Sequence, residues 1–247
     1  MSPGTTATAE DLRIAGLVPL SSVDRPGHLS ATVFCQGCPW RCGYCHNPSI
    51  LDPLAPGAVP FAALAALLER RRGLLDTVVF SGGEATLQHA LIPAARAVRE
   101  AGFEVGLHTG GAFPGRLRAL LEEGLLDWVG LDVKASRAGY AALVGRPGAA
   151  PRAERSLRLL RGSGVEHELR MTVTPGLLGQ VPAVLAEVAA TGGDHLVLQR
   201  ARSTGAAAGF AATLGEERDW PGRFEQALGA ARARGQELGV EVFSRAA

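Results

Sequence analysis

Residues 29–48 read LSATVFCQGCPWRCGYCHNP, and the rest of the chain is organised around this stretch. Its first part, Leu29 to Phe34, is apolar and β-branched, which predicts a buried strand. The remainder contains all four cysteines of the protein. Three of them, Cys38, Cys42 and Cys45, have the spacing C-x3-C-x2-C. A short loop can therefore place three thiolates around one metal group and leave that group an open coordination site.

The composition is that of one folded domain. The chain has 247 residues, of which 47% are apolar and 20% are charged, which is sufficient for a sizeable core. Its 25 basic and 24 acidic residues give a formal net charge of +1, so neither nucleic acid nor an anionic membrane is expected as a partner. Residues 1–10 lack a signal-peptide pattern and are expected to form a flexible tail, with a single domain over 11–247. Clustered cysteines without a disulfide framework favour a cytoplasmic protein.

Apolar runs that predict strands alternate with helical patterns along most of the chain. The predicted strands lie at 29–34, 76–80, 103–107, 127–133, 166–173 and 195–199. This alternation is typical of parallel strands joined by right-handed crossovers, with both faces of the sheet covered. Six such units are fewer than the eight of a closed TIM barrel. We therefore expect an α/β fold, a partial (β/α)6 TIM-like barrel with a parallel sheet, and a doubly wound sheet is the alternative.

Short extensions flank the six units. Residues 12–20 predict a strand before a turn at 21–27. The Ala/Gly/Thr-rich residues 206–214 predict a flexible connection. A mostly helical extension is expected from about 216 to 238, and residues 240–243 predict a final edge strand.

Polar residues follow each predicted strand, at the edge where parallel α/β folds place their active sites. The first strand runs into residues 35–48, which contain the four cysteines and which we call the cysteine loop. The later strand ends carry Gly82, Gly83 and Glu84, then His108 and Thr109, then Asp132 and Lys134, then Arg170, and finally Gln199. Glycines let a backbone approach a ligand closely, a glutamate accepts from an ammonium, and lysine or arginine opposes a carboxylate.

The cysteine spacing, with Tyr44 before the last cysteine and Gly-Gly-Glu after the next strand, resembles the radical S-adenosylmethionine superfamily. Within it, the chain is similar to the glycyl-radical-enzyme activases, and most similar to the activating proteins of anaerobic ribonucleoside-triphosphate reductases. The residues that carry this similarity are Val-Asp-Arg-Pro-Gly at 23–27, Cys-His-Asn-Pro at 45–48 and Asp-Val-Lys at 132–134.

The resemblance implies a mechanism. Cys38, Cys42 and Cys45 would hold a [4Fe-4S] cluster, and S-adenosylmethionine would occupy the open coordination site. Reductive cleavage of this cofactor gives a 5′-deoxyadenosyl radical, which would remove a hydrogen atom from a glycine of the partner enzyme. The implied partners are an anaerobic ribonucleoside-triphosphate reductase, as the substrate, and a flavodoxin or ferredoxin, as the electron donor.

The resemblance and the positions at the strand ends also assign cofactor contacts. These are Tyr44 against the adenine, Gly82, Gly83 and Glu84 at the amino group, Lys134 or Arg170 at the carboxylate, and Asp132, His108, Thr109 and Gln199 around the ribose and methionyl group. Two positions depart from the family pattern. Ala85 replaces the usual proline, and His108 stands where many relatives carry aspartate, which removes a negative charge.

Other interpretations remain open at this point. A radical enzyme acting on a small molecule, such as a 7-carboxy-7-deazaguanine synthase, also uses a short partial barrel. A binding module is a further alternative, in which zinc is held by the three cysteines and His46. Cys35 is interpreted as a small buried apolar residue rather than a ligand.

Overall fold

The computed structural model describes residues 7–245. Within this part of the chain, one sheet of eight strands has its strands in the same order as in the sequence. The strands are β1 (Ile14–Ser21), β2 (Ser30–Cys35), β3 (Thr77–Gly82), β4 (Glu104–Thr109), β5 (Trp128–Asp132), β6 (Glu166–Val173), β7 (His195–Arg200) and β8 (Glu241–Arg245). β1 pairs antiparallel with β2, and every later pair is parallel. The expected α/β fold with a partial, open barrel is confirmed.

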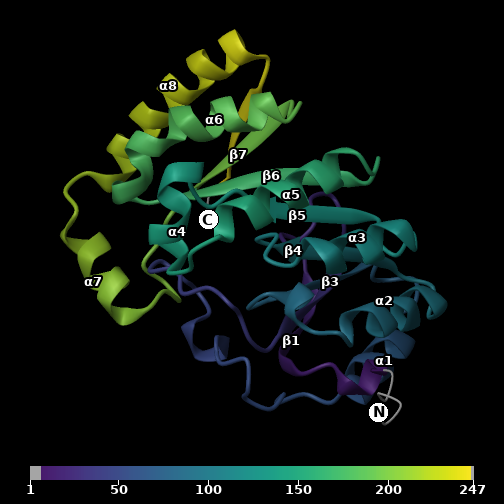
Figure 1. Cartoon of the computed structure of the whole chain (residues 1–247). Coiled ribbons are helices and arrows are strands. Elements are labelled where there is room, and N and C mark those ends of the chain that lie inside the picture. Colours follow the sequence, from purple (N-terminus) through teal and green to yellow (C-terminus); the bar gives the residue numbers. More distant parts are fainter. Residues whose placement is uncertain (1–6, 246–247) are drawn as a thin grey trace.

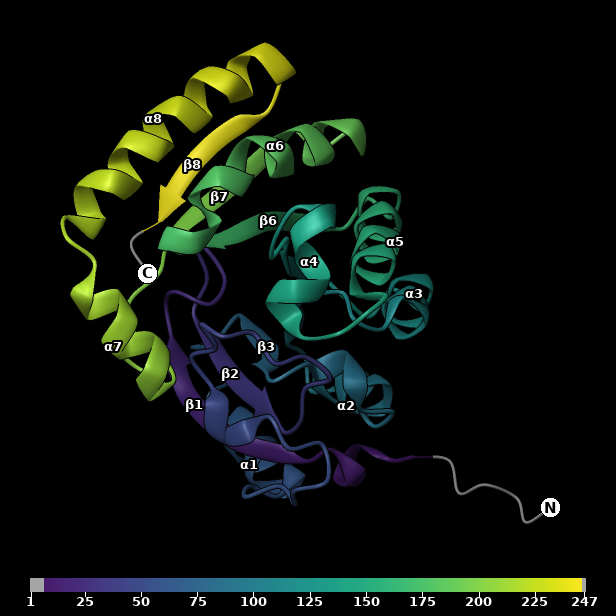
Figure 2. The same cartoon turned by 60° about the vertical axis from the view of Figure 1, so that its left-hand side comes forward.

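Helices cover the outer face of the curved sheet (Figures 1 and 2). They are α1 (Phe61–Arg70), α2 (Leu91–Glu100), α3 (Pro114–Glu122), α4 (Arg137–Val144), α5 (Ala149–Arg161), α6 (Val181–Ala190) and α8 (Trp220–Leu238). Alternate strand residues point to opposite faces. On β3 and β4 the apolar set is fully buried, and its members are Val78, Phe80, Val105 and Leu107. The alternate set, which includes Thr77, Ser81, Glu104 and His108, is directed into the barrel.

The turn between β1 and β2 fills one end of the barrel interior. Arg25 is 4% exposed there, and its guanidinium donates to Thr77 Oγ1 at 2.7 Å. The same guanidinium forms ion pairs with Glu104 and Glu166. Thr77, Glu104 and Glu166 are the first residues of β3, β4 and β6, so this turn occupies the amino-terminal end of the strands. The carboxyl ends of the strands, at the opposite end of the barrel, are therefore free to form a binding site.

Two segments differ from the expected pattern. α4 was not predicted, although Ser136 accepts a hydrogen bond from Gly139 N at its start and Gly145 ends it in the left-handed region. The expected flexible connection contains a helix, α7 (Ala208–Glu216), which stands apart from the other helices in both views (Figures 1 and 2). Ala207 N donates to Cys45 O at 3.3 Å, and the ring centroid of Phe210 is 6.4 Å from that of Tyr44. Contacts with the cysteine loop therefore hold this helix in place.

Near the two ends of its described part, the chain can also be compared with the predictions from sequence. Of the tail expected over 1–10, residues 1–6 lie outside the described residues. Beyond them, Ala9–Asp11 forms a short 3-10 helix in which Ala9 is 8% exposed and packs against the core. At the other end, Pro221 lies in the first turn of α8, where its missing N–H is not needed, and β8 is the expected edge strand. None of the helices in the described range has the length and apolar character needed to cross a membrane.

Candidate active site

A cavity of about 200 Å³ lies at the carboxyl ends of the strands, and we call it the site cavity. It is bordered by the cysteine loop and by the ends of β3, β4, β5 and β6. The predicted residues that line it are Cys38, Cys42, Tyr44, Cys45, Gly82, Gly83, Glu84, His108, Thr109, Asp132, Lys134 and Arg170. Gln199 does not line it. This residue lies on β7, one strand further along the sheet, in register with Thr172 of β6.

Gly82 and Gly83 hold the cysteine loop against the end of β3. Gly83 N donates to Cys35 O at 3.0 Å, and Glu84 N donates to Gly37 O at 2.8 Å. A Cβ on Gly83 would lie 2.3 Å from Gly37 O, and Gly82 has a φ of +105°, which favours glycine. The glycines were expected to admit a ligand. In the structure, the group that approaches them closely is the backbone of the cysteine loop.

Glu84 is 2% exposed and joins the ends of β3 and β4. Its Oε1 accepts hydrogen bonds from the N–H and hydroxyl groups of Thr86 and from Thr109 Oγ1 at 2.7 Å. Its Oε2 accepts from Gly110 N at 2.9 Å. Four protein donors therefore fix this carboxylate at the edge of the site cavity, which satisfies a buried charge.

The three cysteines of the motif line the site cavity as free thiols. Burial raises the pKa of Cys38 to about 12, with a further contribution from the Glu84 charge, and burial also raises the pKa of Cys42. Binding of iron as thiolates would release these protons. Among residues 7–245, no three His, Cys, Asp or Glu side chains are placed to hold a single metal ion. A [4Fe-4S] cluster presents a separate iron to each thiolate, so the donor set fits this group.

Cys35 differs from the other three cysteines. It is fully buried, does not line the site cavity, and is paired in register with Gly82 of β3. Burial raises the pKa of its thiol to about 12, again with a contribution from Glu84. Its place in the core agrees with its interpretation as a small apolar residue.

Asp132, Lys134 and Arg170 form a charge network in the site cavity. Asp132 Oδ1 accepts from Arg170 Nε at 3.1 Å, and its Oδ2 accepts from Lys134 Nζ at 3.1 Å. Burial alone would raise the pKa of Asp132, but the Lys134 and Arg170 cations outweigh it and lower this pKa to about 2. Two cations and one anion leave the network with a net positive charge. It can therefore accept a further carboxylate.

His108 lies beneath this network as a neutral imidazole. Its Nε2 is 2.7 Å from Asp24 O and 3.2 Å from Arg170 Nη1, and its Nδ1 is 3.2 Å from Ser81 Oγ. Removal of the ring from water, together with the Arg170 cation, lowers the pKa of His108 to about 4. The position that carries aspartate in many relatives is therefore uncharged here at neutral pH.

Several residues that line the site cavity were not assigned to the cofactor from sequence: Trp40, Asn47, Leu51, Ser81, Gly110 and Thr172, together with His46, which was considered only as a zinc ligand. Trp40 is 2% exposed, and its ring packs edge-on to Tyr140 of α4 with centroids 5.7 Å apart. A Cβ on Gly110 would lie 2.3 Å from the Trp40 ring. Two features of the sequence could have indicated this contact. One is an aromatic residue, Trp40, between two of the motif cysteines, and the other is the glycine pair at 110 and 111 after β4.

The fold and the site define a partial-barrel α/β protein that carries a three-cysteine loop over the carboxyl ends of its strands. A sequence profile of the Radical SAM superfamily matches residues 32–189, and the chain belongs to this superfamily. The family implies a [4Fe-4S] cluster and S-adenosylmethionine as cofactors.

Two relatives match about half of the chain. A Methanocaldococcus jannaschii protein described as a glycyl-radical enzyme activating enzyme is 36% identical over 135 residues, covering 49% of this chain and 50% of the relative. The pyruvate formate-lyase-activating enzyme of Clostridium pasteurianum is 33% identical over 140 residues, covering 54% of this chain and 58% of the relative. The chain thus spans about half the length of the curated relatives it matches.

Among solved structures, Streptococcus suis SuiB bound to its precursor peptide SuiA is similar, with a TM-score of 0.65 and 13% identity. The match covers 85% of this chain and 47% of SuiB. At this identity the similarity establishes the shared fold alone.

Proposed function

We propose that this protein is a radical S-adenosylmethionine activase that installs a glycyl radical on an anaerobic ribonucleoside-triphosphate reductase. The observation that carries the proposal is the site cavity, which brings the three motif cysteines together with the Gly-Gly-Glu segment and a cationic network. The names of the two relatives support the activase class. The segments at 23–27 and 45–48 support an activase over a small-molecule radical enzyme, and the overall resemblance of the sequence is the basis for proposing the ribonucleotide reductase as the target.

The proposed roles follow from the contacts. Cys38, Cys42 and Cys45 would hold the [4Fe-4S] cluster as thiolates. When bound, the cluster and S-adenosylmethionine supply a single electron and a carbon-centred radical. The protein positions the cofactor and excludes water around it.

The remaining residues would bind and orient the cofactor. The net positive network of Lys134, Arg170 and Asp132 opposes the methionyl carboxylate. Tyr44 lines the site cavity beside Lys134, whose Nζ is 5.9 Å from its ring centroid, and its ring would pack against the adenine. Glu84 contributes a fixed negative charge for the amino group. His108 and Thr109 would contact the ribose and the methionyl group.

The substrate would be a peptide segment of the partner enzyme. The sheet is open, since β1 and β8 lie at its two edges, so the mouth is not closed by a ring of strands. α7 lies beside the cysteine loop through the Ala207 and Phe210 contacts. A flavodoxin or ferredoxin is the proposed electron donor.

Anaerobic reconstitution tests this function. The reconstituted protein should contain about four irons per chain and should cleave S-adenosylmethionine when reduced. Incubated with an anaerobic ribonucleoside-triphosphate reductase, it should generate a glycyl radical that is detectable by electron paramagnetic resonance. Pyruvate formate-lyase should give no such signal under the same conditions.

Matched cysteine variants control the experiment. Cys42→Ala should lose the cluster and all cleavage, whereas Cys35→Ala should retain both, because Cys35 lies outside the site cavity. A glycyl radical on pyruvate formate-lyase alone would show that this enzyme, and not the reductase, is the target. Cleavage without a radical on either protein would favour the small-molecule alternative, and bound zinc in place of iron would favour the binding module.

A further inference from the structure

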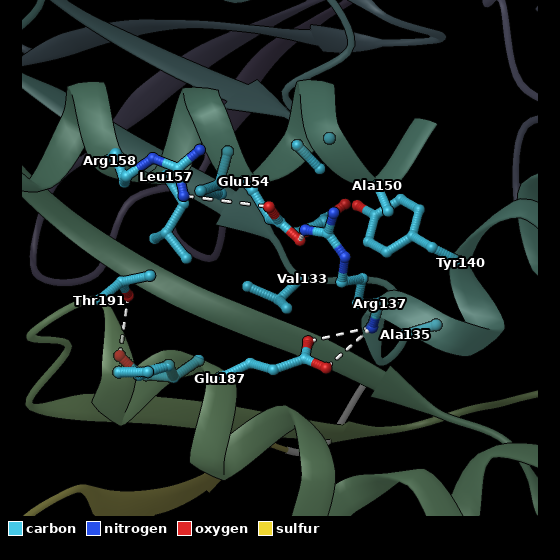
Figure 3. Close-up of a pocket in the computed structure, with 16 residues that line it drawn as sticks. Val133, Ala135, Arg137, Tyr140, Ala150, Glu154, Leu157, Arg158, Glu187 and Thr191 are labelled. Atoms are coloured by element: carbon cyan, nitrogen blue, oxygen red, sulfur yellow. Dashed lines mark hydrogen bonds and ion pairs between the residues drawn. The ribbon is translucent and has the colours of Figure 1, made fainter. Parts of the chain in front are cut away.

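A separate cavity lies on the opposite side of β5, between the sheet and helices α4, α5 and α6 (Figure 3). We call it the helix-side cavity, and its volume is about 230 Å³. Leu131 of β5 and Val133, which follows the end of this strand, line it from the side of the sheet. Small side chains leave the space open, and these are Ala135, Ala150, Ala153 and Ala190. Gly110 and Asp132 line both cavities, so the two lie next to each other.

One polar group in the helix-side cavity has no partner. Tyr140 extends from α4 along the cavity wall, and its side chain is visible beside Ala150 (Figure 3). The residue is 3% exposed, and its hydroxyl makes no hydrogen bond within the described residues. A buried hydroxyl without a partner is destabilising, and most native proteins satisfy such groups. The unsatisfied hydroxyl marks where a ligand would be bound.

The charged residues at the cavity neutralise one another. Arg137 forms an ion pair with Glu154, and Arg158 lies 3.9 Å from the same carboxylate. Glu187 accepts hydrogen bonds from the backbone N–H of Arg137 at 2.9 and 3.0 Å (Figure 3). Arg137 and Arg158 therefore balance Glu154 and Glu187, while Asp132, which also lines the cavity, is paired with Lys134 and Arg170. The cavity has no preference for a charged ligand.

We propose that the helix-side cavity binds a small, neutral, ring-containing molecule with one hydrogen-bonding group, which pairs with the Tyr140 hydroxyl. An apolar cavity of about 150 Å³ is known to take benzene. The larger volume of the helix-side cavity is sufficient for a fused two-ring molecule. The apolar lining supplies most of the affinity, and Tyr140 supplies the orientation.

This cavity is connected to the cysteine loop through α4. The Tyr140 ring packs against Trp40 of the loop with centroids 5.7 Å apart. At the end of the same helix, Val144 O accepts a hydrogen bond from Arg41 N at 2.9 Å. A ligand that holds Tyr140 therefore also restrains the loop that carries Cys38 and Cys42.

Indole and indene form a matched pair of probes, because they share a two-ring shape and differ by the indole N–H. Anaerobic calorimetry on the cluster-loaded protein should show indole binding about fivefold more tightly than indene, the effect of one net hydrogen bond. Tyr140→Phe should bind both with equal affinity. Ala153→Leu, which fills the cavity, should bind neither.

Thermal denaturation establishes that each variant folds, and Ala150→Leu replaces Ala153→Leu if the latter does not. Failure of both probes to bind the natural protein overturns the proposal. A preference for indole that survives Tyr140→Phe overturns the role of Tyr140.

The connection to the cysteine loop has its own measurement. Saturating indole should slow the loss of cluster absorbance to an iron chelator at least twofold in the natural protein, and should leave the rate unchanged in Ala153→Leu. Equal rates with and without bound indole would overturn the connection and leave the binding site itself intact.

Discussion

The two cavities beside β5 are similar in size but are built in opposite ways. In the site cavity, the charged groups Asp132, Arg170 and Glu84 are held by hydrogen bonds, and glycine backbones contact the cysteine loop. In the helix-side cavity, Leu131 and Val133 meet small alanines, and the charges lie in exposed pairs. The shape of the site cavity therefore depends on hydrogen bonds and close backbone contacts, so substitutions there should be poorly tolerated. The helix-side cavity is fixed by side-chain volume and should tolerate substitution at the exposed charges of its rim, Arg137, Glu154 and Arg158.

The largest effect is expected from Gly83→Ala. The new Cβ would lie 2.3 Å from Gly37 O, so the cysteine loop must move away from β3. We expect a loss of unfolding free energy of about 3 kcal/mol or more and a severalfold lower iron content after reconstitution. Gly43→Ala is the matched control, because a Cβ there meets nothing within 4 Å. Equal iron content in the two variants would contradict the role of Gly83 in seating the loop.

The next effect tests the charge network of the site cavity. Asp132→Asn leaves the Arg170 and Lys134 cations without their shared carboxylate, and should cost about 2–3 kcal/mol in chemical denaturation. The exposed pair of Arg96 and Glu123 is the control, and Arg96→Gln should cost less than about 1 kcal/mol. Similar losses of unfolding free energy in the two variants would show that the Asp132 network stabilises the protein no more than an exposed ion pair does.

A smaller effect should appear as a pH dependence that comes from His108. Its folded pKa of about 4 lies below the unfolded value, so the unfolded state binds the proton first as the pH falls. The stabilisation is complete above about pH 6.5 and is lost as the pH falls towards 4, by on the order of 1–2 kcal/mol. His108→Gln should flatten this part of the stability profile measured by urea denaturation. An unchanged slope of unfolding free energy against pH in His108→Gln would show that other titratable groups cause this pH dependence.

The smallest effect is expected at the rim of the helix-side cavity. Glu154→Gln removes the ion pairs with Arg137 and Arg158, whose side chains are 61% and 62% exposed. Unfolding free energy should fall by less than about 1 kcal/mol, and iron content should not change. A loss as large as that of Asp132→Asn would mean that the two cavities do not differ in the way described.

The strands and the position of the site could be predicted from sequence because both depend on local patterns. Runs such as Val78 to Phe80 are apolar on both faces, which indicates a covered parallel sheet. Parallel strands end at one edge, so the polar residues after them had to converge. Gln199 was the exception, because β7 lies beyond the strands that border the site cavity.

The parts that sequence did not reveal depend on register and on distant contacts. The need for glycine at 82 and 83 comes from the pairing of Cys35 with Gly82, which no local pattern specifies. The segment 206–214 was expected to be a flexible connection, since it is rich in alanine, glycine and threonine. Its position is set by Phe210 against Tyr44 and by Ala207 against Cys45. The helix-side cavity likewise arises only when α4, α5 and α6 pack on β5.

The sequential strand order has a consequence for synthesis on the ribosome. Each strand finds its neighbour already made, so the sheet can grow in the direction of translation. The cysteine loop emerges before Gly82 and Gly83, by on the order of a few seconds at typical translation rates. During that interval, the nascent chain presents its thiols without the backbone that later seats them. Delivery of iron is therefore best timed after residue 84 has left the ribosome.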